Sequence, residues 1–439
     1  AKTAGFRYRH IRKLCAKRVF EAKNKEKTIT EKADAILLHP LFGIPIFLII
    51  MAFIFHVTFG ENFLGIKGLP TIGHALKRVS FGWLYYIRDA AAVFLGGVEP
   101  EFIRRLIMEG VIGGVGAVFS FVPQIVCLFV FLSVLEDSGY MARIAFMLDN
   151  VFKKFGLSGR AALPLSMGFG CSVPAVMATR ALEDDRSKRL AILVIPFFSC
   201  GAKLPIYSLF AASFFPDGPD RVIFLVYITG IIVALISAYI LSRLLFKEDE
   251  APFIMEMPEY RMPSPGNLAL LAWNKLKDYI IRAGSVILLA SVFIWVMSNT
   301  GTDFKITANE NQSLLAGLGK LLTPAFRPLG FGGSEGWKNA AAVLSGFIAK
   351  ESVVSSLGVL YASSDGSGLS SAIALNFTNA SALSFMVFNL LCIPCSAAVT
   401  AVKGELKSSG WFTFALIFWL FTAWLISFII YKAALLLSL

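Results

Sequence analysis

Long uncharged apolar runs limit what this chain can fold into more than any other feature. Lys, Arg, Asp and Glu are all absent from residues 111–135, 222–242, 366–402 and 411–431, which are 25, 21, 37 and 21 residues long. A helix needs roughly 20 apolar residues to cross the hydrocarbon layer of a bilayer. Only 16% of the 439 residues are charged, whereas about a quarter are in an average soluble domain. The sequence therefore predicts an all-α polytopic membrane protein rather than a soluble enzyme.

The net charge of +12 is concentrated at the N-terminus, because residues 1–32 hold eleven Lys and Arg against three Glu. A basic arm before the first span follows the positive-inside rule, which explains it without a nucleic-acid partner. The arm also lacks the short apolar core and the small-residue cleavage site of a signal peptide. We therefore expect residues 1–40 to be a cytoplasmic linker arm.

Composition divides the remaining chain into four regions. We expect a first span and interfacial helices in residues 41–110, a first repeat in 111–246, a cytoplasmic loop and an amphipathic helix in 247–282, and a second repeat with C-terminal spans in 283–439. Residues 303–337 are rich in Gly and Asn and are predicted to form an external loop. At roughly 20 residues per crossing, the chain has about eight to ten embedded segments.

Gly and Pro interrupt the apolar segments at corresponding places in the two repeats. Glycines and a proline break residues 168–174, and Pro196 follows; in the second repeat Gly346 is followed by Pro394. Paired interrupted segments of this kind are the best sequence pointer to a transport site near the bilayer midplane. Broken backbone in lipid costs several kcal/mol per unsatisfied group, so we expect broken or re-entrant helices around a packed or water-lined path. Residues 111–135 could cross the membrane or form a hairpin.

Three cysteines lie at these breaks, namely Cys171, Cys200 and Cys395. Ser172 and Ser199 adjoin two of them, so thiolates, hydroxyls and carbonyls could form a shell for a divalent transition metal. All four histidines precede residue 75 and cannot serve a site deep in the later spans. The alternative is that the breaks only kink the helices and that the cysteines pack as small hydrophobic residues. Because thiolate ligands must be deprotonated, metal uptake should fall as the pH drops.

Charged residues inside apolar segments are the other candidates for function. Eleven uncharged residues precede Lys350 and thirteen follow Glu351, and an ionisable residue inside a membrane is a functional hypothesis by default. Neighbouring helical residues do not face each other, so Lys350 and Glu351 do not easily form a structural pair in one pocket. We therefore expect Glu351 to supply charge compensation or gating. Lys203 needs a polar partner or must snorkel to the interface. Cys392 could assist Cys395 or only pack.

Several segments resemble the Gate regions of the FeoB family of bacterial ferrous-iron transporters. The resemblance is carried by residues 168–180, 135–143, 196–205, 346–351 and 393–395. It implies two Gate-type repeats and transport of Fe²⁺ as the substrate across the bacterial inner membrane. It also implies functional Gate cysteines, which match Cys171, Cys200 and Cys395.

The resemblance carries further expectations about partners and control. Family members join this membrane region to an N-terminal GTPase domain, but this sequence has no phosphate-binding loop motif. GTP would therefore act only through a G domain absent from this chain, and the transporter itself is not expected to be an enzyme. A cytoplasmic G domain, a small accessory protein or a second copy of the chain could be its partner.

Two other functions stay open at this point. A nucleoside-type secondary transporter would need amide side chains at the breaks, and Asn389 is the nearby one. An intramembrane thiol or serine enzyme would use Ser199, Cys200 and Lys203, since Ser199 and Lys203 have the i,i+4 spacing of a helical dyad.

Overall fold

The computed structural model is helical in most of the residues that it describes. These are residues 42–59, 70–94, 103–112, 126–182, 184–245, 260–279, 313–361 and 369–437, except for single positions at 105, 132, 136 and 334, together with parts of 30–39, 122–123 and 281–301. Within them the one β pairing joins Gly301 and Ser313. The chain forms two compact units, residues 1–46 and 47–439, and the following concerns the second.

The described residues before α8 include α3 (Gly43–Phe59), α4 (Ile72–Phe94), a π-helical segment (Leu106–Ile112), an apolar helix within Val126–Leu135 and α7 (Tyr140–Lys153). The predicted first span is thus helical in α3. The middle of α4 leaves Trp83, Tyr85 and Tyr86 exposed, as an interfacial helix would. Residues 113–121 lie outside the described part of the chain, so the alternative for 111–135 stays open.

The first repeat continues as a series of short helices and one long one. It contains α8 (Ala162–Gly168), α9 (Ser172–Ala178), α10 (Asp185–Val194), two 3₁₀ turns at Ile195–Phe197 and Gly201–Lys203, α11 (Leu204–Phe214) and α12 (Pro219–Leu244). The predicted interruptions are confirmed here, between α8 and α9 and between α10 and α11. Pro196 cannot donate an amide hydrogen bond, so α10 ends just before it.

The second repeat is preceded by α13 (Pro265–Tyr279), which is the helix predicted in 247–282. It then comprises α15 (Leu314–Phe326), α16 (Gly336–Ser345), α17 (Ser352–Leu360), α18 (Leu369–Asn376), α19 (Asn379–Leu391), α20 (Ser396–Leu406) and α21 (Ser409–Leu436). The predicted span near 283–302 lies mostly outside the described residues.

The prediction of an unbroken external loop over 303–337 was wrong, because α15 lies inside it. The Ser313 side chain accepts a hydrogen bond from the backbone N–H of Ala316 at 3.1 Å and so caps the new helix. Buried Leu315 and Ala316 place the apolar side of α15 against α16. Asn309 and Asn311 precede this helix, but two of the glycines that suggested a loop, Gly317 and Gly319, lie within it.

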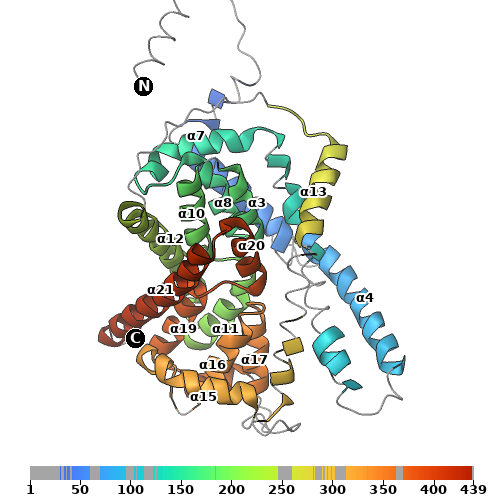
Figure 1. Ribbon diagram of the computed structural model, residues 1–439, viewed down its shortest axis with the longest axis vertical. Helices are drawn as coiled ribbons and strands as arrows, with labels where there is room; N and C mark the ends of the chain where they lie inside the picture. Colours follow the sequence, from blue (N-terminus) through green and yellow to red (C-terminus); the bar gives the residue numbers. More distant parts are fainter. Residues whose placement is uncertain are drawn as a thin grey trace, which may run out of the picture. The chain divides into compact units, whose positions relative to one another are not determined.

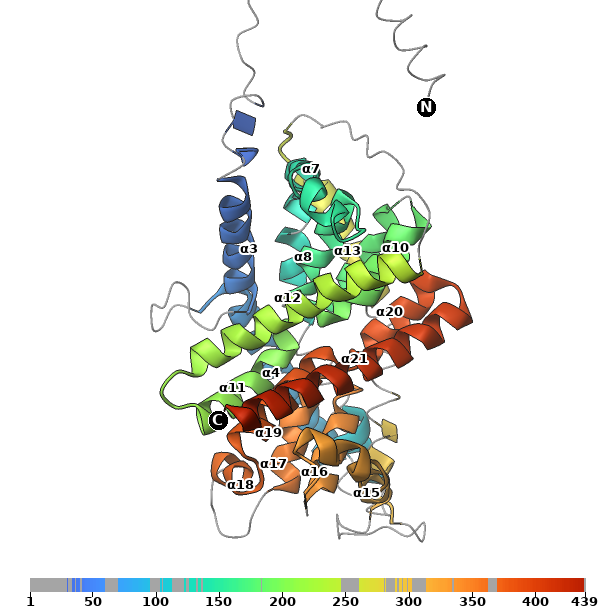
Figure 2. The same cartoon turned by 90° about the vertical axis from the view of Figure 1, so that its left-hand side faces the viewer.

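Helix α19 is the centre of the packing, because it contacts α11, α12 and α21. Figure 2 shows α21 running alongside α19 towards the C-terminus. Phe385 of α19 packs against Phe210 of α11, with ring centroids 4.9 Å apart. The buried Trp419 of α21 donates from Nε1 to the carbonyl of Leu193 at 2.7 Å, which ties the last helix to α10.

Four stretches of helix among the described residues are long and apolar enough to cross a membrane. They are Asp185–Phe214, Pro219–Leu244, Asn379–Leu406 and Ser409–Leu436. Two of the four, Asp185–Phe214 and Asn379–Leu406, contain the Ile-Pro interruptions that the sequence indicated. Length and composition therefore support a polytopic membrane protein.

A glycine lets α12 approach the first of these interruptions. A Cβ atom at Gly230 would lie 2.5 Å from the carbonyl oxygen of Phe197, which no side chain could tolerate without a backbone shift. The long helix therefore supports the broken segment at van der Waals distance.

Candidate functional site

The first break of the first repeat is a three-residue interruption between α8 and α9. The amides of Gly170 and Cys171 both donate to the carbonyl of Met167 at 3.0 Å, which ends α8 in a tight turn. Cys171 then adopts an extended conformation, with φ −157° and ψ 129°, and α9 begins at Ser172. Cys171 is half-buried and Ser172 is buried.

The second break of the first repeat lies between α10 and α11. Cys200 is again extended, with φ −87° and ψ 161°, and directly precedes the 3₁₀ turn that leads into α11. The amide of Gly201 donates to the carbonyl of Gly170 at 3.4 Å. This hydrogen bond joins the two breaks and uses backbone groups that the interruptions leave without helical partners.

The second repeat shows the same arrangement with different side chains. Helix α16 ends at Ser345, and Glu351 stands directly before α17, while Cys395 stands directly before α20. Ser396 joins these two breaks, because its amide donates to the carbonyl of Phe347 at 2.7 Å and its hydroxyl donates to the carbonyl of Ile348 at 3.0 Å.

Each of the four breaks thus places one candidate ligand on the residue that precedes the next helix. These residues are Cys171, Cys200, Glu351 and Cys395, and all four are half-buried. Cys171 lies within electrostatic range of the other three, and Cys395 lies within range of Cys200 and Glu351. The structure brings together residues that are up to 224 positions apart in the chain.

The four groups do not form a closed metal cage. Among the described residues, no three His, Cys, Asp or Glu side chains converge closely enough to hold a metal ion.

The two serines have different environments. Ser172 is the first residue of α9. The Ser199 hydroxyl donates to the hydroxyl of Tyr207 in α11 at 3.3 Å, and the Tyr207 ring packs edge-on against Tyr227 of α12. The sequence did not single out these two tyrosines, because neither interrupts a helix or carries a formal charge.

Two buried lysines lie beside the breaks. Lys203 is only 1% exposed, and its Nζ donates to the carbonyls of Pro196 at 3.0 Å and of Leu390 at 2.7 Å. Lys203 therefore has polar partners and does not snorkel. These partners differ from the Tyr207 hydroxyl that Ser199 contacts, so no hydrogen bond between Ser199 and Lys203 supports the catalytic dyad considered above.

Lys350 is the second buried lysine, with 3% exposure. Its Nζ contacts the Sγ atom of Cys392 at 2.9 Å. Cys392 follows the last residue of α19, where a positive charge is favourable at the carboxyl end of a helix.

An ionic bridge joins the two repeats near the far end of α9. Glu405 of α20 accepts from Arg180 Nε at 2.5 Å and from Lys188 Nζ at 3.1 Å. Arg180 follows α9 and Lys188 belongs to α10, and α20 packs directly on α9. Nothing local in the sequence indicates this bridge, because Glu405 is more than 200 residues from both cations.

Family comparisons agree with this arrangement. The family described as "Nucleoside recognition" (Gate) matches residues 118–214 and 280–409, which include both pairs of breaks. The family described as "Ferrous iron transport protein B C terminus" matches residues 223–275, which lie between them.

Curated relatives match nearly the whole chain. It is 40% identical over 416 residues to the Fe(2+) transporter FeoB of Staphylococcus aureus, and the match covers 92% of this chain and 59% of that protein. Identity to FeoB of Campylobacter jejuni is 38%, with coverage of 94% and 67%. A Porphyromonas gingivalis protein named as a fusion of Fe(2+) transport protein A and FeoB is 35% identical, with coverage of 93% and 52%. The chain thus spans about three fifths of the Staphylococcus aureus relative, and it belongs to the FeoB family of Fe(2+) transporters.

Proposed function

We propose that this chain carries Fe²⁺ across the bacterial inner membrane along a path lined by Cys171, Cys200, Cys395 and Glu351. The observation that carries the proposal is that all four helix breaks present a potential ligand at the same place, just before a helix begins. Three sulfurs and one carboxylate offer a mixed donor set for a divalent transition metal. Ser172 and Ser199 adjoin two of the thiols and supply hydroxyl oxygens to the same path.

In this proposal Fe²⁺ moves by exchanging one donor atom for the next along the path. An ion that leaves water must replace its hydration shell, and conduction requires binding that is weak or divided among several sites. Thiols within electrostatic range of one another can pass the ion from one repeat to the other. The carboxylate of Glu351 offsets the double positive charge at half-buried depth, where an uncompensated ion is costly.

We assign the control of this path to a GTPase domain and to a small accessory protein. The N-terminal arm, residues 1–40, lies in the cytoplasm and links the membrane region to a GTPase domain. The relative named as a fusion with Fe(2+) transport protein A supports a small accessory protein as a second partner. Assembly with further copies of the chain would place several such paths side by side.

Uptake of ⁵⁵Fe(II) into proteoliposomes containing the intact chain, kept under reductant, tests the proposal. Replacing Cys171, Cys200 and Cys395 together by Ala should abolish uptake. Cys127→Ala is the matched control, because Cys127 is a buried helical cysteine beside Thr58 and not at a break. Uptake by the triple variant at the level of the Cys127 variant would rule out a thiolate path.

A spectroscopic measurement separates binding from flux. X-ray absorption at the iron edge should show Fe–S scattering in the parent chain and only light-atom ligands in the triple variant. Retained Fe–S scattering in the variant would assign the metal to other sulfurs.

A further inference from the structure

A cavity lies between α8, α9 and α13, close to the first break of the first repeat. It has a volume of about 470 Å³ and is lined mainly by apolar side chains of α8, α9 and the helix that contains Phe129. Leu163, Met167, Pro174 and Met177 provide most of this apolar wall. The volume lies in the range of pockets that enclose small ligands, about 300 to 1,000 Å³.

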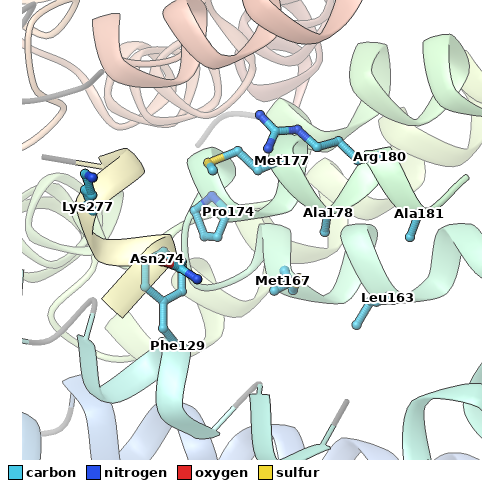
Figure 3. Close-up of a pocket in the computed structure, with 10 residues that line it drawn as sticks. All are labelled: Phe129, Leu163, Met167, Pro174, Met177, Ala178, Arg180, Ala181, Asn274 and Lys277. Atoms are coloured by element: carbon cyan, nitrogen blue, oxygen red, sulfur yellow. The ribbon is translucent and has the colours of Figure 1, made fainter. Parts of the chain in front are cut away.

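The polar groups of this cavity lie at its edges. Arg180 follows α9, and Asn274 and Lys277 belong to α13, which forms the opposite wall. Figure 3 shows Lys277 and Asn274 on one side of the space and Arg180 with Met177 on the other, with Pro174 between them. An apolar interior with cationic and amide groups at the rim matches an amphiphile.

The sign of the charge excludes the transported ion as its occupant. The described lining residues include two cations and no carboxylate. Arg180 pairs with Glu405, a carboxylate that it shares with Lys188, whereas Lys277 is an exposed cation at the other edge. A divalent cation would be repelled here, whereas an anionic group would be attracted.

The helix that closes the cavity has the features of an interfacial helix. Trp273 and Leu270 of α13 are about three-fifths exposed, and Trp favours the headgroup level of a bilayer. The guanidinium of Arg143 stacks on the ring of Tyr260, 3.8 Å from its centroid, which fixes the segment leading into α13 against α7. Basic pockets between membrane helices are known to hold the headgroups of anionic lipids.

We propose that this cavity binds an anionic phospholipid from the surrounding bilayer. The phosphate lies between Lys277, Asn274 and Arg180, and an acyl chain lies among Met167 and Met177. Because α9 begins at Ser172, directly after Cys171, the lipid holds the helix whose other end carries a proposed iron ligand.

The binding test uses native mass spectrometry on the intact chain released from nanodiscs that contain equal amounts of phosphatidylglycerol and phosphatidylcholine with the same acyl chains. We expect phosphatidylglycerol to be retained preferentially. Lys277→Ala should lower its occupancy about fivefold, since a surface lysine contributes about this factor to anionic lipid binding. Lys432→Ala is the control, because Lys432 is an exposed cation near the end of α21 and should leave occupancy unchanged.

A cavity-filling variant keeps the proposal falsifiable if loss of charge alone proves ambiguous. Met177→Trp should expel both lipids while the far-ultraviolet circular dichroism of the chain stays the same. Equal retention of the two lipids, or unchanged phosphatidylglycerol occupancy in both variants, would overturn the proposal. A Met177→Trp variant that blocks iron uptake but keeps its lipid would assign the cavity to the ion path instead.

Discussion

The first repeat breaks at Cys171 and Cys200, whereas the second breaks at Glu351 and Cys395. The backbone solution is the same, since a single residue in each repeat joins the two breaks by hydrogen bonds. Gly201 does so with one bond of 3.4 Å, and Ser396 does so with two, of 2.7 Å and 3.0 Å. The geometry of the breaks is thus shared, while the donor atoms differ.

This difference divides the chemistry between the repeats. The first repeat offers two sulfurs, and the second offers one sulfur and one carboxylate. Both buried lysines contact the second repeat, because Lys203 donates to the carbonyl of Leu390 and Lys350 contacts the sulfur of Cys392. Both ammonium groups would repel a cation on the proposed path. The carboxylate of Glu351 can offset this repulsion, because it belongs to the same repeat as the groups that the lysines contact.

The largest expected effect on iron uptake comes from removing the proposed iron ligands one at a time. Because Cys171 and Glu351 hold equivalent places, Cys171→Ala and Glu351→Ala should each lower iron uptake by tenfold or more, on the order of the losses seen when metal-site partners are removed. Uptake of ⁵⁵Fe(II) by proteoliposomes measures this. If only the cysteine variant loses uptake, the equivalence of the two places is wrong.

An isosteric substitution of Glu351 tests whether its charge or its shape is required. Glu351→Gln keeps the shape of the side chain and removes its charge, so it should behave like Glu351→Ala if charge compensation is the role. Uptake near the parent level in the Gln variant would instead assign Glu351 to packing.

The next effect concerns the two lysines. Lys203→Met should destabilise the chain by about 2 to 4 kcal/mol, because two carbonyls lose a charged hydrogen-bond donor while one buried charge is removed. Lys350→Met should cost about half as much, since its ammonium contacts only one sulfur. Thermal unfolding in nanodiscs, followed by circular dichroism, compares the two variants. An equal loss would show that the bond across to Leu390 adds nothing.

Much of this arrangement could be predicted from the sequence. Gly168, Gly170 and Pro196 located the breaks, because these residue types oppose continuous helix in any context. The position of Cys171, Cys200 and Cys395 at those breaks followed directly. Local chemistry was sufficient for each of these predictions.

What the sequence could not provide depends on contacts between distant segments. Glu405 gave no local sign that it would bridge Arg180 and Lys188, and Leu390 gave none that it would accept from Lys203. Helix α15 was missed for a different reason, since flanking Gly and Asn residues outweighed the cap at Ser313. Such contacts are set by how the helices pack and not by the residues next to them.

A smaller effect is expected at the bridge between the repeats. The Glu405 side chain is 5% exposed, but that of Arg180 is 45% exposed, so solvent screens part of the attraction. After that allowance, Glu405→Gln should destabilise the chain by about 1 to 2 kcal/mol. Thermal unfolding measures the loss.

The control for this bridge is another ion pair. Glu335 contacts Lys338 at 2.9 Å, but its own side chain is 43% exposed. Glu335→Gln should therefore change stability by less than about 0.5 kcal/mol. A Glu405 variant as mild as this control would mean that α9 and α20 are held together by packing alone.

The smallest expected effect is a difference in acid stability between the two helices that precede the Ile-Pro interruptions, α10 and α19. In the first repeat α10 is capped by Asp184, which accepts from the amides of Arg186 and Ser187. In the second repeat α19 is capped by Thr378 and Ser381, which are uncharged. Partial burial raises the pKa of Asp184, but the hydrogen bonds from Ser187 and Arg186 outweigh it and hold that pKa below its usual value. Of these two helices, α10 therefore carries the titratable cap.

The sign of the pH dependence follows from that lowered pKa. Because the folded-state pKa of Asp184 lies below its unfolded value of about 3.9, the stabilisation is complete above that pH and is lost as the pH falls through the folded value. Hydrogen exchange, corrected for intrinsic rates, should show the first turn of α10 losing protection under acid while the first turn of α19 keeps it. Asp184→Asn keeps a good capping residue and removes the charge, so it should cost less than about 1 kcal/mol at neutral pH and abolish the difference between the two helices. Equal acid sensitivity of both helices in the parent chain would place the titrating group elsewhere, because Thr378 and Ser381 have no charge to lose.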